Sequence, residues 1–237
     1  MLEAVVFDLY ETLVTEYDPE WSPPRATISQ RLGVDPAAFA AEYGARYERR
    51  MAGRFTDFAS VLRDIVEALG GTPDEGLLRE LQQERLSEKA KPFQRVEDDV
   101  IDALRQIERE GVRIGLISNC TADEVASWSA PPLASLIPDP VFSYEVASIK
   151  PNPRIYHLAC DRLDVAPAAT LFVGDGGSEE LTGAARAGLV PCCALWFLRR
   201  WPGRGDLVDR RRSEHPSLDT LGDLIGLVDR LRRKGRE

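Results

Sequence analysis

Histidine is scarce in this sequence, and the cysteines are spaced in a way that disfavours disulfide bonds. Only His157 and His215 occur among 237 residues, which argues strongly against a zinc site built from histidines. The four cysteines include no C-x-x-C pair, and two of them are adjacent, so both could not easily be bridged in a compact fold. We therefore expect reduced thiols and a cytoplasmic location.

Long apolar runs and an excess of basic charge are also missing. No window approaches the roughly 18 apolar residues that a membrane-spanning helix needs, and the N-terminus lacks the basic region and cleavage site of a secretory signal. Acidic residues outnumber basic residues by 39 to 30, which gives a formal net charge of −9. We expect neither membrane nor nucleic-acid partners, and this charge favours small-molecule or protein partners. The oligomeric state stays open.

Apolar runs typical of β-strands alternate with helical periodicity. These runs are AVVFDLY, VRIGLIS, TLFVGD and VPCCALWF, at residues 4–10, 112–118, 170–175 and 190–197. Helical spacing occupies residues 98–111 and 179–188, and a last helix is expected over 218–233. This alternation predicts an α/β fold with a doubly wound parallel sheet. The arginine-rich stretch 199–212 is expected to be a solvated loop, in preference to an anion-binding lid.

Residues 15–95 interrupt the alternation. Pro and Gly separate amphipathic helical stretches there, at about residues 24–33, 36–53, 56–71 and 74–90. We interpret this segment as an all-helical domain inserted after the first strand, with a core domain formed by residues 1–14 and 96–237. Plausible hinges are marked by the prolines at positions 19, 23, 24 and 92.

Three of the strand-like runs end in polar residues. Asp8 lies at the end of the first run, Ser118 and Asn119 end the second, and Asp175 ends the third. Ligands bind outside the carboxyl ends of the strands in an open parallel sheet, so we expect these side chains to converge there. Each of them alone has an ordinary interpretation as a turn or helix cap. Only the joint pattern indicates a functional site.

Four stretches of the chain together resemble the motifs of the haloacid dehalogenase-like superfamily of hydrolases. In chain order they are FDLYETL, LISNC, the lysine of ASIKPNPRIY, and FVGDGGSEELTGAARAG. The resemblance spans nearly the whole chain, and the helical insert matches the cap that follows the first motif in many members. It implies a Rossmann-like core with a helical cap.

The resemblance also implies roles for individual residues. Asp8 would be the nucleophile, and Thr12 would steady the loop that carries it. Ser118 would contact the phosphate of a small phosphorylated substrate, and Asn119 could donate further hydrogen bonds to the phosphoryl oxygens. Lys150 would balance charge on the nucleophile and on the group in transit.

The acidic residues need a cation if they gather at one edge of the sheet. Asp8 attacks only as an anion, and a carboxylate close to Asp175 and Glu180 resists ionisation unless positive charge offsets the repulsion. Lys150 supplies one charge, and a magnesium ion would supply more. In the resembled family the ligands would be the carboxylates of Asp8 and Asp175 and the backbone carbonyl of Tyr10.

Tyr10 departs from the pattern of the family's phosphatases. They usually carry an aspartate there, which protonates the leaving alcohol, and a phenol with a reference pKa of about 10 is a poor replacement. Tyrosine also occupies this position in the superfamily's 2-haloacid dehalogenases, which need no metal. The fourth motif favours a phosphatase. The dehalogenases resemble the pattern SSN followed by Asp at this strand end and lack the metal-binding carboxylate, whereas this chain has GDGGSEE with Asp175 in the liganding position.

Three glutamates have no assigned role. Glu11 replaces a glycine that is common in the first motif, and Glu180 stands where an aspartate is more usual. Glu179 and Glu180 both fall in the expected first turn of a helix, where negative charge is favourable in any case. Proton transfer by Glu11 and purely structural roles for the other two stay open.

The sequence therefore predicts magnesium-dependent hydrolysis of a small phosphate monoester through an aspartyl-phosphate on Asp8. The first alternative is a metal-free 2-haloacid dehalogenase in which Asp8 attacks carbon. Lys150 and Asn119 would support that attack, and Tyr10 would line the pocket. The second alternative is a catalytically silent relative with a binding role.

Overall fold

The computed structural model describes residues 1–20, 26–130 and 132–233. Within these ranges, six parallel strands form one sheet with the order β3-β2-β1-β4-β5-β6. The strands are β1 (Ala4–Phe7), β2 (Arg113–Ser118), β3 (Val141–Phe142), β4 (Thr170–Gly174), β5 (Val190–Ala194) and β6 (Ser217–Leu218). The chain winds outward from β1 to β3 and then returns to the other side of β1. The predicted doubly wound sheet is thus confirmed, with its switch point between β1 and β4.

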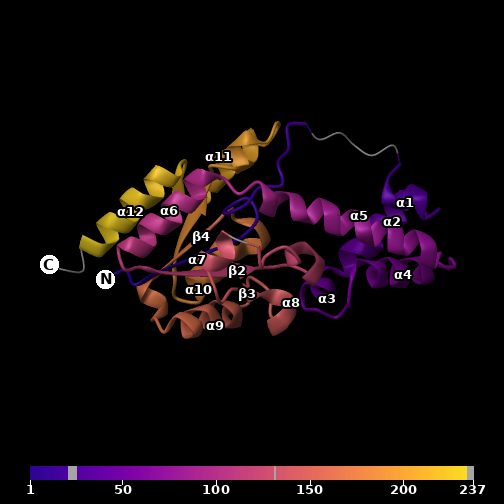
Figure 1. The fold of residues 1–237 in the computed structure, drawn as a ribbon, viewed down its shortest axis with the longest axis horizontal. Coiled ribbons are helices and arrows are strands. Elements are labelled where there is room, and N and C mark those ends of the chain that lie inside the picture. The colour runs from indigo at the N-terminus through magenta and orange to yellow at the C-terminus, as the bar shows by residue number, and fades with distance from the viewer. Residues whose placement is uncertain (21–25, 131, 234–237) are drawn as a thin grey trace.

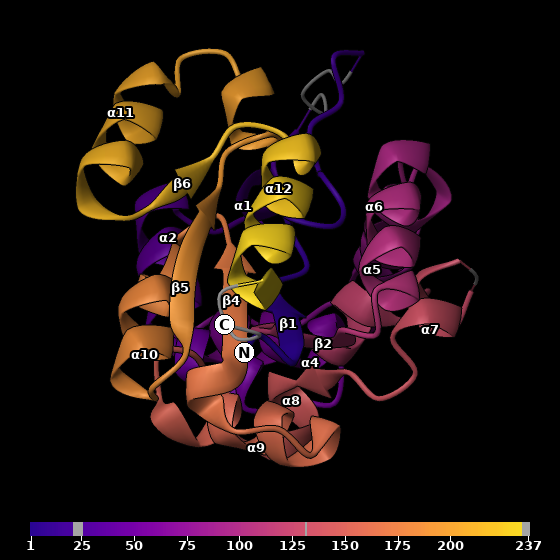
Figure 2. The same cartoon turned by 90° about the vertical axis from the view of Figure 1, so that its left-hand side faces the viewer.

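Helices cover both faces of the sheet (Figure 1; end-on in Figure 2). They are α6 (Asp98–Arg109), α7 (Leu133–Leu136), α8 (Ser143–Val146), α9 (Pro153–Leu163), α10 (Glu180–Arg186), α11 (Gly205–Glu214) and α12 (Leu221–Arg233). The β1 residues alternate between two buried clusters: Val5 and Phe7 pack in the cluster that includes α6 and α12, and Val6 in the cluster that includes α9 and α10. This alternation explains why β1 is apolar throughout.

Short 3-10 helices complete the connections of the core. They are η1 (Ala122–Val125), η2 (Pro167–Ala169), η3 (Gly177–Glu179) and η4 (Leu198–Arg200). The four cysteines are unpaired and buried, as the sequence predicted. None of the helices in the described ranges has both the length and the apolar character needed to cross a membrane.

The described part of residues 15–95 folds into helices and contributes no strand to the sheet. These helices are α1 (Ile28–Arg31), α2 (Pro36–Ala45), α3 (Tyr47–Met51), α4 (Phe58–Ala68) and α5 (Glu75–Gln94). Helices α1, α2 and α4 lie at the end of the molecule opposite the two chain termini, and α3 lies nearer the core (Figure 1). Apolar residues of α4 and α5 share a small core of their own, which includes Leu62 and Leu78. The all-helical insert after the first strand is confirmed, while its exact boundaries stay a prediction.

Two expectations within the insert need correction. The helix expected over 36–53 is divided at Arg46, whose side chain pairs with Asp64 of α4 at 2.5 Å. Pro92, expected as a hinge, lies inside α5, which continues to Gln94. A proline so near the end of a helix removes only one of the last hydrogen bonds, so the helix tolerates it. The expected hinges at 23 and 24 lie outside the described residues.

The arginine-rich stretch 199–212 is not a loop along its whole length. Helix α11 begins at Gly205. Its residue Val208 is buried in the apolar cluster that includes α9 and α10. The prediction of a loop failed because only two apolar residues of this charged stretch, Leu207 and Val208, pack on the core. Two apolar residues are too few to show helical periodicity in the sequence. Elements α7, α8 and β3 also went unpredicted, since runs of two to four residues carry no periodicity.

Candidate active site

The predicted site residues meet at the carboxyl edge of the sheet. Asp8 directly follows β1, Asp175 directly follows β4, and Ser118 is the last residue of β2. These three strands are neighbours, so distant parts of the chain end side by side. The backbone N–H of Asp8 donates to the carbonyl of Val173 at 2.8 Å, which extends the β1–β4 pairing to the site itself. Asp8 and Ser118 are buried, and Asp175 is half-buried.

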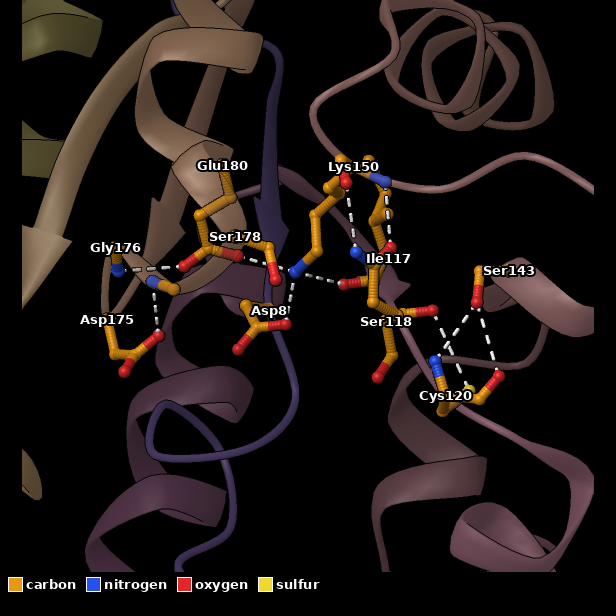
Figure 3. A network of polar contacts seen from close by, with 12 residues as sticks. Asp8, Ile117, Ser118, Cys120, Ser143, Lys150, Asp175, Gly176, Ser178 and Glu180 are labelled. Atoms are coloured by element: carbon orange, nitrogen blue, oxygen red, sulfur yellow. Dashed lines mark hydrogen bonds and ion pairs between the residues drawn. The ribbon is translucent and has the colours of Figure 1, made fainter. Parts of the chain in front are cut away.

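Lys150 lies at the centre of a buried charge network (Figure 3). Its ammonium group donates to Oδ1 of Asp8 and, at 2.5 Å, to Oε2 of Glu180. A further contact of 3.4 Å joins it to the carbonyl of Ile117. Asn119 holds the loop that carries the lysine: its Oδ1 accepts from the Lys150 backbone N–H at 2.8 Å, and its Nδ2 donates to the Lys150 carbonyl at 3.0 Å. The amide of Asn119 therefore positions Lys150.

The charges in this network do not balance. Burial raises the pKa of Asp8, Lys150 opposes that rise, and nearby Asp175 adds to it. Burial and the charge of Asp8 likewise raise the pKa of Glu180. Burial alone would lower the pKa of Lys150, but Asp8 and Glu180 more than offset it and keep that pKa above its ordinary value. One lysine faces three carboxylates, so a further cation would relieve the repulsion.

Glycines shape the turn that carries Asp175. A Cβ atom on Gly174 would lie 2.2 Å from Oε1 of Glu180, so the glutamate carboxylate fills the space of a missing side chain. Gly176 has φ of +85°, which favours glycine. Its N–H donates to Oε1 of Glu180 at 2.8 Å. The N–H of Gly177 donates to Oδ1 of Asp175 at 2.9 Å. The turn thus holds both carboxylates.

The oxygen atoms of this cluster fit a hard divalent cation. Carboxylate oxygens of Asp8, Asp175 and Glu180 lie within 4.8 Å of one another, and such oxygens suit Mg²⁺. Both oxygens of Glu180 already accept hydrogen bonds, from Lys150 and Gly176. Asp8 and Asp175 each use Oδ1 in such contacts and have a second oxygen to offer. The donor set therefore favours Asp8 and Asp175 as ligands and Glu180 as a partner of Lys150.

The Tyr10 side chain is engaged elsewhere in the core. Its hydroxyl donates to the carbonyl of Glu124 in η1 at 2.5 Å, and Lys89 of α5 lies 5.2 Å from the centre of its ring. Burial and the charge of Glu124 raise the pKa of Tyr10 well above its ordinary value. The phenolic proton is therefore committed to a backbone carbonyl. Metal binding by the Tyr10 carbonyl stays a prediction.

The turn after β1 is unusual at Glu11. This residue has φ of 57°, in the left-handed region where a glycine is favoured. Its carboxylate accepts hydrogen bonds from Thr15 Oγ1 at 2.9 Å and from Trp201 Nε1 at 2.8 Å. Thr12 is fully buried, and its carbonyl accepts from Trp196 Nε1 at 2.9 Å. Its hydroxyl has no hydrogen-bond partner among the described residues. These contacts give Glu11 a structural role in anchoring the turn.

Two tyrosines near the site escaped the sequence analysis. Tyr156 of α9 is buried, and its hydroxyl donates to the carbonyl of Glu180 at 2.8 Å. Tyr47 reaches from α3 to the core, where its hydroxyl lies 3.0 Å from Ser178 Oγ. Asn119 Nδ2 also donates to it, at 3.4 Å. No sequence signal could have revealed Tyr47, because its position depends on how the insert packs on the core.

Comparison with known families agrees with this geometry. The family described as haloacid dehalogenase-like hydrolase matches residues 2–188, which include all four motifs. This chain belongs to the haloacid dehalogenase-like hydrolases. The family assignment makes it a hydrolase, and the acidic cluster lies where the motifs of such hydrolases meet.

Relatives of this haloacid dehalogenase-like hydrolase include both phosphatases and dehalogenases. A glyceraldehyde 3-phosphate phosphatase from Methanopyrus kandleri is 28% identical over 209 residues, which are 80% of this chain and 82% of the relative. An (S)-2-haloacid dehalogenase from Xanthobacter autotrophicus is 26% identical over 184 residues, which are 76% of this chain and 70% of the relative. Sequence similarity therefore does not distinguish phosphatase from dehalogenase activity, and the distinction has to come from the residues of the active site.

Solved structures share the fold of this haloacid dehalogenase-like hydrolase. A 2-haloacid dehalogenase from Pseudomonas syringae pv. Tomato DC3000 aligns with a TM-score of 0.63 at 21% identity, covering 97% of this chain and 99% of that one. A phosphatase from Thermococcus onnurineus aligns with a TM-score of 0.61 at 20% identity, covering 96% and 98%. Such low identities establish the fold and leave the activity to other observations.

Proposed function

We propose that this chain is a metal-dependent phosphatase that hydrolyses a small phosphate monoester. The observation that carries the proposal is the Asp175 carboxylate, which has an oxygen within 4.8 Å of oxygens of Asp8 and Glu180. Without a metal ion, the added negative charge of this carboxylate would oppose the approach of an anionic substrate, so the cluster favours a site that binds a cation. We further propose that residues 15–95 form a cap over a core of residues 1–14 and 96–237. The four free thiols favour a cytoplasmic location.

In the proposed first step, a carboxylate oxygen of Asp8 attacks phosphorus. A bond forms between this oxygen and phosphorus, the bond from phosphorus to the leaving oxygen breaks, and Asp8 carries the phosphoryl group as an acyl phosphate. Lys150 neutralises charge on the nucleophile, and Ser118 donates a hydrogen bond to a phosphoryl oxygen. A bound magnesium ion, held by Asp8 and Asp175, would supply further positive charge to these oxygens.

In the proposed second step, water attacks phosphorus, the aspartyl oxygen leaves, and Asp8 returns as a carboxylate. Neither step has a carboxylic acid at position 10 to move protons. The leaving oxygen must therefore take its proton from water, since the Tyr10 hydroxyl is bound to the Glu124 carbonyl. We expect phosphate esters with acidic leaving groups, such as aryl phosphates, to react faster than simple alkyl esters.

The second candidate function is metal-free 2-haloacid dehalogenation, which is favoured by Tyr10 at the position of the missing aspartate. Asp8 would attack the carbon that bears the halogen, halide would leave with the bonding electrons, and water would hydrolyse the resulting ester. Lys150 already neutralises Asp8 without a metal. Asn119 would support the attack by holding the backbone of Lys150. This reaction needs no acid to protonate the leaving group, so a tyrosine at position 10 would not hinder it.

Release of phosphate from an aryl phosphate, with and without magnesium, tests the proposal. We expect wild type to turn over only with magnesium, and Asp8→Asn to abolish turnover because an amide is not a nucleophile. Tyr10→Asp should raise kcat by supplying a carboxylic acid near the leaving group. The exposed Asp209→Asn on α11 is the matched control and should behave as wild type.

Three results would overturn the proposal. Phosphate release that is indifferent to magnesium and to a chelator would remove the metal from the mechanism. Chloride release from a 2-haloacid in the presence of a chelator, without phosphate release, would assign the dehalogenase reaction. Absence of turnover on both panels of substrates would leave a binding role.

A further inference from the structure

We propose that Tyr47 limits the size of the substrate's leaving group, because the insert places its phenol across the mouth of the active site. The inference relies on the proposed active site around Asp8. In a dehalogenation the leaving group is the halide, so Tyr47 would there limit the carbon chain of the haloacid. Its hydroxyl lies 3.0 Å from Ser178 Oγ and accepts a hydrogen bond from Asn119 Nδ2 at 3.4 Å. It is the contact through which the insert touches the loops of both the second and the fourth motif.

The sheet topology puts this contact over the nucleophile. Asn119 follows the end of β2, and Ser178 lies in the turn after β4. Strand β1, which ends beside Asp8, lies between β2 and β4 in the sheet. A side chain that bridges the loops after β2 and β4 therefore spans the exit from β1. The half-buried Tyr47 stands between that exit and solvent.

Contacts at the other end of α3 hold Tyr47 in this place. The carbonyl of Met51 accepts a buried hydrogen bond from Ser143 Oγ at 2.7 Å. Gly53 packs so closely on the core that a Cβ atom there would lie 2.3 Å from the carbonyl oxygen of Tyr144. Because Tyr47 and Met51 belong to one helix, docking of this end fixes the phenol relative to Asp8. A large leaving group must then displace the ring or undock the helix.

This geometry favours a small, polar leaving group. A group that fits below the phenol can offer a hydroxyl or carbonyl oxygen to the Tyr47 hydroxyl in place of Ser178. An apolar or branched group offers no such partner, and would leave the Tyr47 hydroxyl without the hydrogen bond that it makes to Ser178. We therefore expect monoesters of short hydroxylated or carbonyl-bearing alcohols to be preferred over bulky aryl esters of equal leaving-group acidity.

Substitution of Tyr47 tests the inference through a ratio of rates. The measured quantity is kcat/KM for naphthyl phosphate divided by kcat/KM for a small ester, glycerol 3-phosphate, in each variant with magnesium. We expect Tyr47→Ala to raise this ratio at least tenfold by opening the mouth of the site. Tyr47→Phe keeps the ring, so the ratio should stay within about twofold while KM for the small ester rises. Differences in leaving-group acidity cancel between variants.

Tyr43→Ala is the matched control. Tyr43 is a half-buried tyrosine of the same insert that packs against Phe39, Phe58 and Arg50. Among the described residues its hydroxyl makes no hydrogen bond to Asn119 or Ser178, which are the partners of Tyr47. Its removal should lower the thermal stability of the insert without moving the ratio. A ratio that stays flat in Tyr47→Ala, or that moves equally in Tyr43→Ala, would overturn the inference.

Two further experiments test the role of Tyr47 if the protein proves not to be a phosphatase. If phosphate release fails and halide release succeeds, the same ratio is measured with a long-chain 2-haloacid and 2-chloropropionate. Without turnover, calorimetry compares the dissociation constants of naphthylmethylphosphonate and methylphosphonate. In whichever arm applies, Tyr47→Ala should raise the preference for the larger compound over the smaller one at least tenfold relative to wild type. An unchanged preference would contradict the role of Tyr47.

Discussion

Tyr10 determines which proton transfers this site can perform. Its hydroxyl is bound to the carbonyl of Glu124, and its ring lies beneath Lys89 of α5. The side chain therefore links the loop after β1 to η1 and to the insert. Such a link stabilises the molecule and, in the proposed reaction, keeps the phenolic proton on the Glu124 carbonyl and away from the leaving group.

Replacement of Tyr10 by phenylalanine separates these two roles. We expect Tyr10→Phe to keep kcat for an aryl phosphate within about twofold of wild type. The free energy of unfolding should fall by about 1 kcal/mol, the usual net contribution of one hydrogen bond. Urea denaturation and steady-state kinetics check the two values. A loss of kcat by about a hundredfold would show that the phenol takes part in the chemistry.

Gly174 and Glu180 form a second residue-level test. A Cβ atom at position 174 would overlap the Glu180 carboxylate, which Lys150 and Gly176 hold in place. We expect Gly174→Ala to destabilise the fold by about 1–3 kcal/mol, the usual cost of overpacking, and to lower activity strongly.

The Glu180→Asp substitution shortens the side chain at position 180, so it should relieve the overlap between that carboxylate and the Cβ atom that Gly174→Ala adds. We expect the double variant to recover most of the stability that Gly174→Ala loses, as measured by thermal unfolding of the four proteins of the cycle. Additive losses in the double variant would mean that the two positions do not share this space.

At the scale of elements, α5 docks on η1 through charged groups. Arg85 of α5 pairs with Glu124 at 2.9 Å, and Lys89 lies 3.4 Å from the same carboxylate. The Glu124 carboxylate also accepts from the Thr121 N–H at 2.8 Å. Burial alone would raise the pKa of Glu124, but Lys89 and Arg85 outweigh it and hold the pKa below its ordinary value. The ionised Glu124 carboxylate therefore contributes to docking of α5 on the core.

A lowered pKa gives a definite pH dependence. The ion pairs of Glu124 stabilise the fold above the unfolded pKa of about 4.5, and this contribution is lost as the pH falls through the lower folded value. We expect Glu124→Gln to lower the free energy of unfolding by about 2 kcal/mol at pH 7, and by progressively less below pH ~4.5. Urea denaturation of both proteins across this range measures the difference.

Glu88→Gln is the control for this prediction. Glu88 is exposed on the same helix and pairs with Lys91 at 2.7 Å. Exposed pairs contribute at most about 1 kcal/mol, so this variant should differ little from wild type at any pH. A stability difference of Glu124→Gln that does not change with pH would contradict the proposed ion pairing.

At the scale of the whole molecule, the proposed metal site would couple folding to cation binding. Repulsion among Asp8, Asp175 and Glu180 exists only in the folded state, where the sheet brings them together. A cation that binds the folded state alone stabilises it by about 2.7 kcal/mol at a concentration a hundred times its dissociation constant. We expect magnesium to raise the thermal unfolding midpoint by several degrees.

Asp175→Asn should remove most of this shift, and the exposed Asp206→Asn on α11 should retain it. Differential scanning calorimetry with magnesium and with a chelator makes the comparison independent of turnover. An equal shift in both variants would place the cation elsewhere on the molecule.

Much of the architecture could be predicted from local pattern. Apolar runs such as residues 170–175 mark strands buried on both faces, and residues 98–111 show helical spacing, because burial imposes these periods on the sequence. The short element β3 and helix α11 could not be predicted in this way. Their identity depends on a few contacts with distant residues, which leave no period in the chain.

For the site, the sequence by itself determined that Asp8, Ser118 and Asp175 lie together, because polar residues that end neighbouring parallel strands must meet at one edge. Only the tertiary structure decided that Lys150 pairs with both Asp8 and Glu180 and that Tyr47 closes the mouth of the site. The physical reason is that strand ends are positioned by backbone hydrogen bonds of regular geometry. Side chains from loops and from the insert are positioned by packing between segments far apart in the chain.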